Sequence, residues 1–153
     1  MRITAIIAAA GKGERSECEN KLFEQAQGKT VLEYAAQKFL DCDKIGDIII
    51  VSAKENKDRI RKLFEGKNKP VNVVCGGATR TASVKNALIS AKGADIVLIH
   101  DGARPFVSEK VIEDCIKSVI NFGSGIAAVP VRDTLKKADN GCIAGGIDRE
   151  NLY

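Results

Sequence analysis

The chain has 153 residues, of which 44% are apolar and 29% charged, and its formal net charge is +4. This suits one soluble domain with a substantial core, and no apolar run is long enough to cross a membrane. Basic residues are interspersed with acids and aromatic residues are few, so a nucleic-acid surface with stacking aromatics is not expected. The start MRITAII leads directly into a strand pattern, which predicts a cytoplasmic protein without a signal peptide.

Short apolar runs alternate with helical patterns along the first 130 residues. Strands are predicted over 3–9, 47–51, 71–75, 95–99 and 126–129. Helices are predicted from residue 31, over 57–65, over 81–92, and from Ser108 to Phe122, with Thr30 and Glu33 forming a capping box. The alternation predicts an α/β fold, a Rossmann-like, doubly wound and mostly parallel sheet with helices on both faces.

The alternation stops after Pro130. Two short strand patterns, Leu135-Lys-Lys137 and Cys142-Ile-Ala144, flank an Asn140-Gly141 turn signal. We therefore expect a single domain over residues 1–153, with a β-hairpin arm near its C-terminus spanning 131–149.

The loops that follow the predicted strands differ in chemistry from the loops that follow the helices. The strand-end loops read AAGKGER, GGATRTAS, HDGARP and PVRDTLK, and they contain Arg15, Arg80, Asp101, Arg104, Arg132 and Asp133. Ligands of open parallel sheets bind at the carboxyl ends of the strands. This sorting indicates an enzyme or a ligand-binding protein.

Each motif also has a plainer interpretation. Gly11-x-Gly13 is neither a dinucleotide fingerprint nor a Walker A loop, so its cations mark either a phosphate site or a solvated turn. Asp101 suits a Mg²⁺ ligand or a turn aspartate, and Arg104 a phosphate contact or a surface ion pair. His100 is read as a packed histidine without a catalytic role. Five cysteines without a C-x-x-C spacing predict neither a zinc site nor a disulfide framework.

Six stretches together carry a family resemblance: AAAGKGER, the following Lys21, GGATRTASVKNAL, IHDGARPF, AAVPVRDTLKKAD and IDRENLY. The chain resembles the 2-C-methyl-D-erythritol 4-phosphate cytidylyltransferases of non-mevalonate isoprenoid biosynthesis, within the sugar- and polyol-phosphate nucleotidyltransferase superfamily. The ribitol-5-phosphate cytidylyltransferases are close relatives and stay an alternative. A catalytically inactive nucleotide-binding or regulatory domain is a third possibility.

The resemblance implies an enzyme that joins CTP to the polyol phosphate with Mg²⁺ as cofactor. It implies catalytic roles for Arg15 and Lys21, Mg²⁺ binding by Asp101, and a homodimer formed through the arm. The implied nucleotide-binding residues are Ala9, Ala10, Gly11, Gly13, Gly77, Ala78, Arg80 and Ser83, and the implied substrate-binding residues are Arg104, Thr134 and Arg149. Family members usually have proline where this chain has Asn20, and they continue beyond the position of Tyr153, so a C-terminally truncated form is expected.

Overall fold

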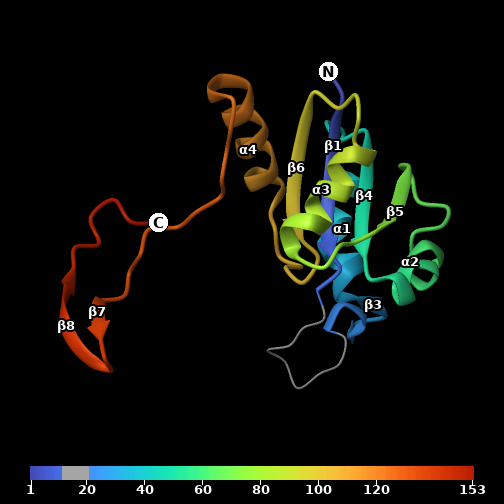
Figure 1. Ribbon diagram of the computed structural model, residues 1–153. Coiled ribbons are helices and arrows are strands. Elements are labelled where there is room, and N and C mark those ends of the chain that lie inside the picture. Colours follow the sequence, from blue (N-terminus) through green and yellow to red (C-terminus); the bar gives the residue numbers. More distant parts are fainter. Residues whose placement is uncertain (12–20) are drawn as a thin grey trace.

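A four-stranded parallel sheet forms the centre of the protein (Figure 1). The computed structural model describes residues 1–11 and 21–153, so Gly13 and Arg15 of the predicted site lie outside the described residues. The strand order is β5-β4-β1-β6, with β1 at Ile3–Ala9, β4 at Asp47–Ser52, β5 at Val71–Cys75 and β6 at Ile96–Asp101. Every neighbouring pair in this sheet is parallel, which confirms the predicted α/β class.

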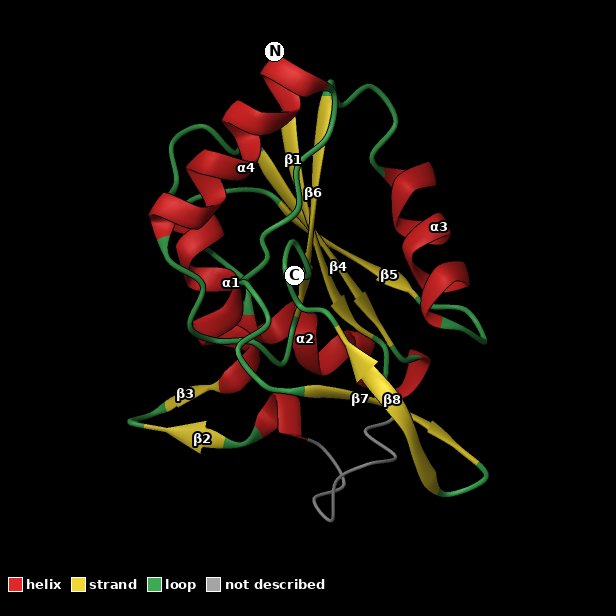
Figure 2. Ribbon diagram, turned by 90° about the vertical axis from the view of Figure 1, so that its left-hand side faces the viewer, coloured by secondary structure: helices red, strands yellow, loops and turns green. Residues whose placement is uncertain are grey.

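Helices cover both faces of the sheet because successive strand side chains point to opposite sides. On one face, Ile7 of β1 and Ile50 of β4 pack in the larger core with side chains of α1 (Val31–Asp41), α2 (Lys57–Leu63) and α4 (Glu109–Phe122). On the other face, Ile6 and Ile49 pack against α3 (Arg80–Ser90). Figure 2 shows α3 on one side of the sheet and α1 and α4 on the other.

Side-chain caps fix where three of the helices begin. Thr30 and Glu33 form the predicted capping box of α1, in which the Thr30 hydroxyl accepts a hydrogen bond from the Glu33 N–H at 3.2 Å. The Thr79 hydroxyl accepts from the Ala82 N–H at 3.1 Å at the start of α3, and Ser108 caps α4. The α3 and α4 caps hold these helix starts shortly after the ends of β5 and β6.

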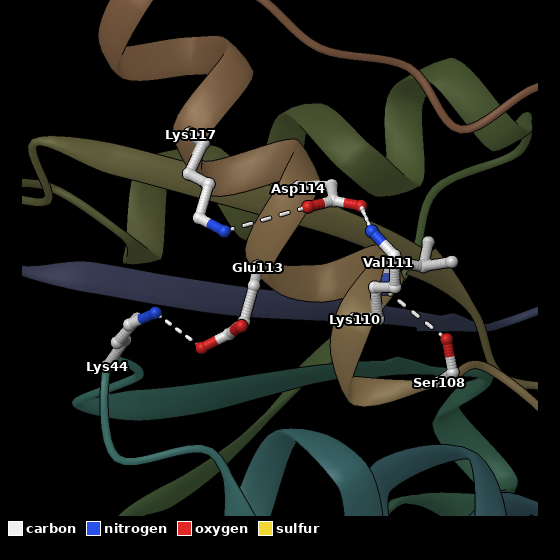
Figure 3. A network of polar contacts seen from close by, with 7 residues as sticks. All are labelled: Lys44, Ser108, Lys110, Val111, Glu113, Asp114 and Lys117. Atoms are coloured by element: carbon white, nitrogen blue, oxygen red, sulfur yellow. Dashed lines mark hydrogen bonds and ion pairs between the residues drawn. The ribbon is translucent and has the colours of Figure 1, made fainter.

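Helix α4 is attached to the sheet by apolar packing and by surface charges. Its Ile112 and Ile116 are buried in the larger core. Glu113 pairs with Lys44 from the α1–β4 loop, while the other ion pairs of Figure 3 join residues within α4. Because exposed ion pairs contribute little, the two isoleucines supply most of the attachment.

The predicted fifth strand at residues 126–129 is wrong. This segment leaves α4 toward the arm without strand pairing, and Ile126 and Val129 are 91% and 78% exposed. A strand needs a neighbour for its backbone N–H and C=O groups, and no described segment provides one here. Apolar composition alone therefore predicted a strand that does not form.

The hairpin prediction is confirmed. Strands β7 (Leu135–Asp139) and β8 (Cys142–Ile147) pair antiparallel, and Asn140 and Gly141 have φ values of 47° and 79°, as an Asn-Gly hairpin turn requires. The arm stands away from the central sheet in Figure 1. Two further strands of two residues each, β2 (Gln25–Ala26) and β3 (Lys29–Thr30), precede α1. No described helix combines the length and apolarity of a membrane span.

Candidate active site

Two glycine-containing loops lie against the carboxyl end of β1. A Cβ atom on Gly76 would be 2.6 Å from the Ala10 Cβ, so only glycine allows the loop after β5 to come this close. The Gly102 N–H donates a hydrogen bond to the Ala8 carbonyl at 2.9 Å, which holds the loop after β6 on the other side. The predicted residues Ala9, Ala10 and Gly11 therefore lie between the other two strand-end loops.

Ser83 stabilises the loop between β5 and α3. The Ser83 side chain is buried, and its hydroxyl oxygen accepts a hydrogen bond from the Gly77 N–H at 3.0 Å. Asn86 adds a second support by donating to the Cys75 carbonyl at 3.2 Å. Gly77 and Ala78 are exposed on this braced loop, so their backbone is accessible to a ligand.

Asp101 is held between two arginines, one at the start of α3 and one in the loop after β6. Arg80, the first residue of α3, donates from Nη2 to Asp101 Oδ1 at 2.8 Å. Arg104 places its Nε 3.1 Å from Asp101 Oδ2. The hydrogen bond from Arg80, followed by the positive charges of both arginines, holds the pKa of Asp101 below its usual value. We call these three residues the Asp101 clasp.

His100 has a positional role that the sequence analysis did not assign. Its Nε2–H donates to the Arg104 carbonyl at 2.9 Å, and the Arg104 N–H donates to the Asp101 carbonyl at 3.0 Å. The His100 ring lies beside Phe39, with 5.0 Å between the ring centroids. These contacts fix the backbone that carries Arg104. The sequence signal was the place of His100 next to Asp101 and four residues before Arg104.

Replacing Arg80 with glutamine is expected to raise the pKa of Asp101 toward its usual value, because the strongest stabilisation of the carboxylate is lost. A ¹³C NMR titration of the Asp101 carboxyl group measures this change. Since the folded-state pKa lies below the unfolded one, the clasp adds stability above the unfolded pKa and loses it as the pH falls through the folded pKa. The Arg80 side chain is well exposed and that of Asp101 is partly exposed, so we expect a small stability effect. An unchanged titration would contradict this origin of the shift.

Lys21 begins a short 3-10 helix, η1 (Lys21–Phe23), whose next two residues are buried. Leu22 and Phe23 belong to the larger core, and the guanidinium of Arg59 lies 3.9 Å above the Phe23 ring. The Lys21 side chain itself is exposed. Its backbone is therefore anchored by the two buried residues that follow it.

Thr134 and Arg149 are not brought to Asp101 within this chain. Both are exposed and belong to the arm region, where the Arg149 guanidinium donates to the Arg132 carbonyl. Figure 1 shows the arm well separated from the end of β6. The structure thus places Arg104 with Asp101 and leaves the other two predicted substrate-binding residues apart.

The donor set at this edge fits a divalent cation only in part. Within residues 1–11 and 21–153, no cluster of three or more His, Cys, Asp or Glu side chains is arranged to hold a metal ion. Mg²⁺, however, is commonly bound through one or two carboxylates together with substrate phosphates. Asp101 fits that mode as a single carboxylate whose other partners would come from a bound nucleotide.

Comparison with known proteins gives a consistent picture. The family described as IspD, 2-C-methyl-D-erythritol 4-phosphate cytidylyltransferase, matches residues 3–153. A relative of that name from Clostridium acetobutylicum is 43% identical over 97% of this chain and 67% of its own length. A relative from Bacillus mycoides is 36% identical with the same coverage.

Solved structures agree with the sequence relatives. The 4-diphosphocytidyl-2C-methyl-D-erythritol synthase of Anaerococcus prevotii superposes with a TM-score of 0.87 at 30% identity, covering 99% of this chain and 67% of that one. The 2-C-methyl-D-erythritol 4-phosphate cytidylyltransferase of Thermus thermophilus gives a TM-score of 0.74 at 29% identity, covering 98% of this chain and 65% of that one. The present chain thus spans about two thirds of the length of the relatives that it matches.

Proposed function

Because this chain belongs to the 2-C-methyl-D-erythritol 4-phosphate cytidylyltransferase family, we propose that it joins CTP to 2-C-methyl-D-erythritol 4-phosphate in isoprenoid biosynthesis. The products are the cytidine diphosphate polyol and diphosphate. The observation that carries the proposal is the convergence of three strand-end loops at one edge of the sheet, with Arg80, Asp101 and Arg104 in contact there. Loops in this position are where open parallel sheets bind their ligands.

The chemistry requires positioning and charge neutralisation more than proton transfer. An oxygen of the polyol phosphate attacks the α-phosphorus of CTP, and the bond from that phosphorus to the oxygen bridging the α- and β-phosphates breaks. The electron pair leaves with diphosphate. The nucleophile is already an anion, so no general base is needed, and His100 is used for structure. Fixed cations near the α-phosphate lower the barrier by stabilising charge that builds in the transition state.

Each part of the site has a proposed role. The triphosphate is contacted by backbone groups of Ala9, Ala10, Gly11 and Gly13. The rest of the nucleotide-binding site is formed by Gly77, Ala78, Arg80 and Ser83. Arg15 and Lys21 act on the α-phosphate. Asp101 holds Mg²⁺, which neutralises phosphate charge when bound. Arg104, Thr134 and Arg149 bind the polyol phosphate.

The separation of the arm from the clasp supports a homodimer. Thr134 and Arg149 belong to the arm region, which lies apart from the end of β6 in Figure 1, and the arm exposes Ile143 and Ile147. A second copy that accepts the arm would cover these isoleucines and complete the substrate site. A cytoplasmic location and the absence of a nucleic-acid partner stay predictions.

Diphosphate release tests the proposed reaction directly. The protein from the complete reading frame is incubated with CTP, Mg²⁺ and either 2-C-methyl-D-erythritol 4-phosphate or ribitol 5-phosphate. We expect release with the methylerythritol substrate. Preference for ribitol 5-phosphate would assign the chain to the alternative activity, and CTP binding without release with either polyol would indicate an inactive binding domain.

Removing divalent cations is expected to abolish turnover, and Mg²⁺ should restore it, because Asp101 stands at the strand end that faces the proposed triphosphate. Asp101→Asn should lower kcat/KM by about 10²-fold or more while its thermal melting stays close to wild type. Asp58→Asn is the matched control, since Asp58 is also an exposed aspartate paired with an arginine, here Arg61 on α2. Full activity in excess EDTA would refute the metal role.

A further inference from the structure

We propose that Arg80 and Arg104 keep divalent cations away from Asp101 until a nucleoside triphosphate draws the Arg80 guanidinium off the carboxylate. Metal binding would then depend on nucleotide binding. The inference rests on the proposed function, because it takes CTP as the ligand that releases the clasp. It adds a role for the two arginines before any substrate is bound.

Both oxygens of the Asp101 carboxylate are already engaged. Oδ1 accepts from Arg80 at 2.8 Å and Oδ2 lies 3.1 Å from Arg104 Nε, so a metal ion that binds either oxygen has to share it with a guanidinium or displace that group. Two positive charges beside one negative charge also repel a divalent cation. With no cluster of metal-binding side chains in the described part of the chain, Asp101 has little to offer a free cation.

The clasp is built to open at low cost. The side chains of Arg80 and Arg104 are 68% and 76% exposed, and exposed ion pairs are weak. A triphosphate offers several anionic oxygens, which a guanidinium binds in a bidentate, charge-assisted manner. Exchange of one carboxylate for a triphosphate is therefore favourable for Arg80, and the phosphate of the polyol offers Arg104 a similar exchange.

Only the side chains need to move in this exchange. Arg80 begins α3 directly after its Thr79 cap, and Arg104 is held through the hydrogen bond that His100 donates to its carbonyl. The backbone of each arginine is thus held in place, while its guanidinium group can move. Released from Asp101, the guanidinium groups would stay at the same edge of the sheet as the carboxylate that they free for the metal.

The thermodynamic linkage between CTP binding and metal binding can be measured. If CTP raises the affinity for the metal, the metal must raise the affinity for CTP by the same factor. Part of this coupling comes from removing the clasp. Weakening the clasp by mutation should therefore raise metal affinity without CTP and reduce the coupling between the two ligands.

The experiment measures Mn²⁺ binding by electron paramagnetic resonance of the free ion, without and with CTP, on the protein from its complete reading frame. Arg80→Gln should bind Mn²⁺ about tenfold more tightly than wild type when CTP is absent. The double variant Arg80→Gln/Asp101→Asn should lose this gain. Arg61→Gln, which removes an arginine from the Asp58 ion pair on α2, should bind Mn²⁺ like wild type.

The outcomes separate this inference from the proposed reaction. Equal Mn²⁺ affinity in wild type and Arg80→Gln, or a gain that persists without Asp101, would overturn the clasp as a barrier to metal. If CTP with the wild-type protein removes no more free Mn²⁺ than CTP and the protein remove separately, the coupling is overturned. Expected Mn²⁺ results together with no diphosphate release from any polyol phosphate would refute the reaction while supporting the clasp.

Discussion

Replacing Lys21 with alanine is expected to lower kcat by about 10²–10³-fold, because a preorganised cation that stabilises transition-state charge typically contributes that much. The dissociation constant for CTP should change far less. An interaction made mainly in the transition state affects turnover more than ground-state binding. The same result is expected for Arg15→Ala, although Arg15 lies outside the described residues.

The anchoring of η1 supports the proposed role of Lys21, because it holds the backbone from which the side chain extends. The resemblance described above implies proline before this lysine, whereas this chain has Asn20. Leu22 and Phe23 compensate from the other side, since both are buried in the core immediately after Lys21. The backbone of Lys21 is thus held by the residues that follow it.

Single-turnover rates and CTP dissociation constants measured separately test this role. Lys38→Ala is the matched control, because Lys38 is an exposed lysine on α1 and its loss changes the net charge equally. Lys21→Arg should recover part of the rate. If Lys21→Ala and Arg15→Ala bind CTP much more weakly but turn over normally at saturation, these residues only clamp the triphosphate.

The sequence was sufficient to predict the four strands of the sheet and the edge where the candidate site lies. Apolar runs bounded by glycines and caps predicted β1, β4, β5 and β6, because a strand buried on both faces needs little beyond apolar residues. The sorting of charged residues into strand-end loops then placed Arg80, Asp101 and Arg104 at one edge. Local pattern and sheet topology suffice for this because they do not depend on side-chain conformation.

Long-range pairing limited the rest of the prediction. Residues 126–129 have a strand composition, but whether they pair depends on a neighbour that the local sequence does not specify. The clasp and the His100 hydrogen bond depend on which way exposed side chains turn, and no spacing rule predicts that Arg80 contacts Asp101 across 21 residues.

Two inactive variants are expected to restore activity when they are combined in one dimer. The proposal places Arg149 of one subunit in the site that contains Asp101 of the other, because the arm lies apart from its own clasp. Arg149→Ala and Asp101→Asn should each have little activity alone. In a mixed dimer, the core of the Arg149→Ala chain receives an intact arm from the Asp101→Asn chain, so one complete site forms.

Random pairing of equal amounts of the two variants, refolded together, makes about half of the dimers mixed, and each of these has one complete site of two. We therefore expect about a quarter of wild-type activity in the mixture. Asp101→Asn combined with Lys21→Ala is the control, because both changes lie in the same core and no pairing gives a complete site. Lys137→Ala, an exposed change on β7, should stay active by itself. A mixture as inactive as its components would mean that Arg149 serves its own subunit. The arm would then have to fold back toward Asp101, where the structure does not place it.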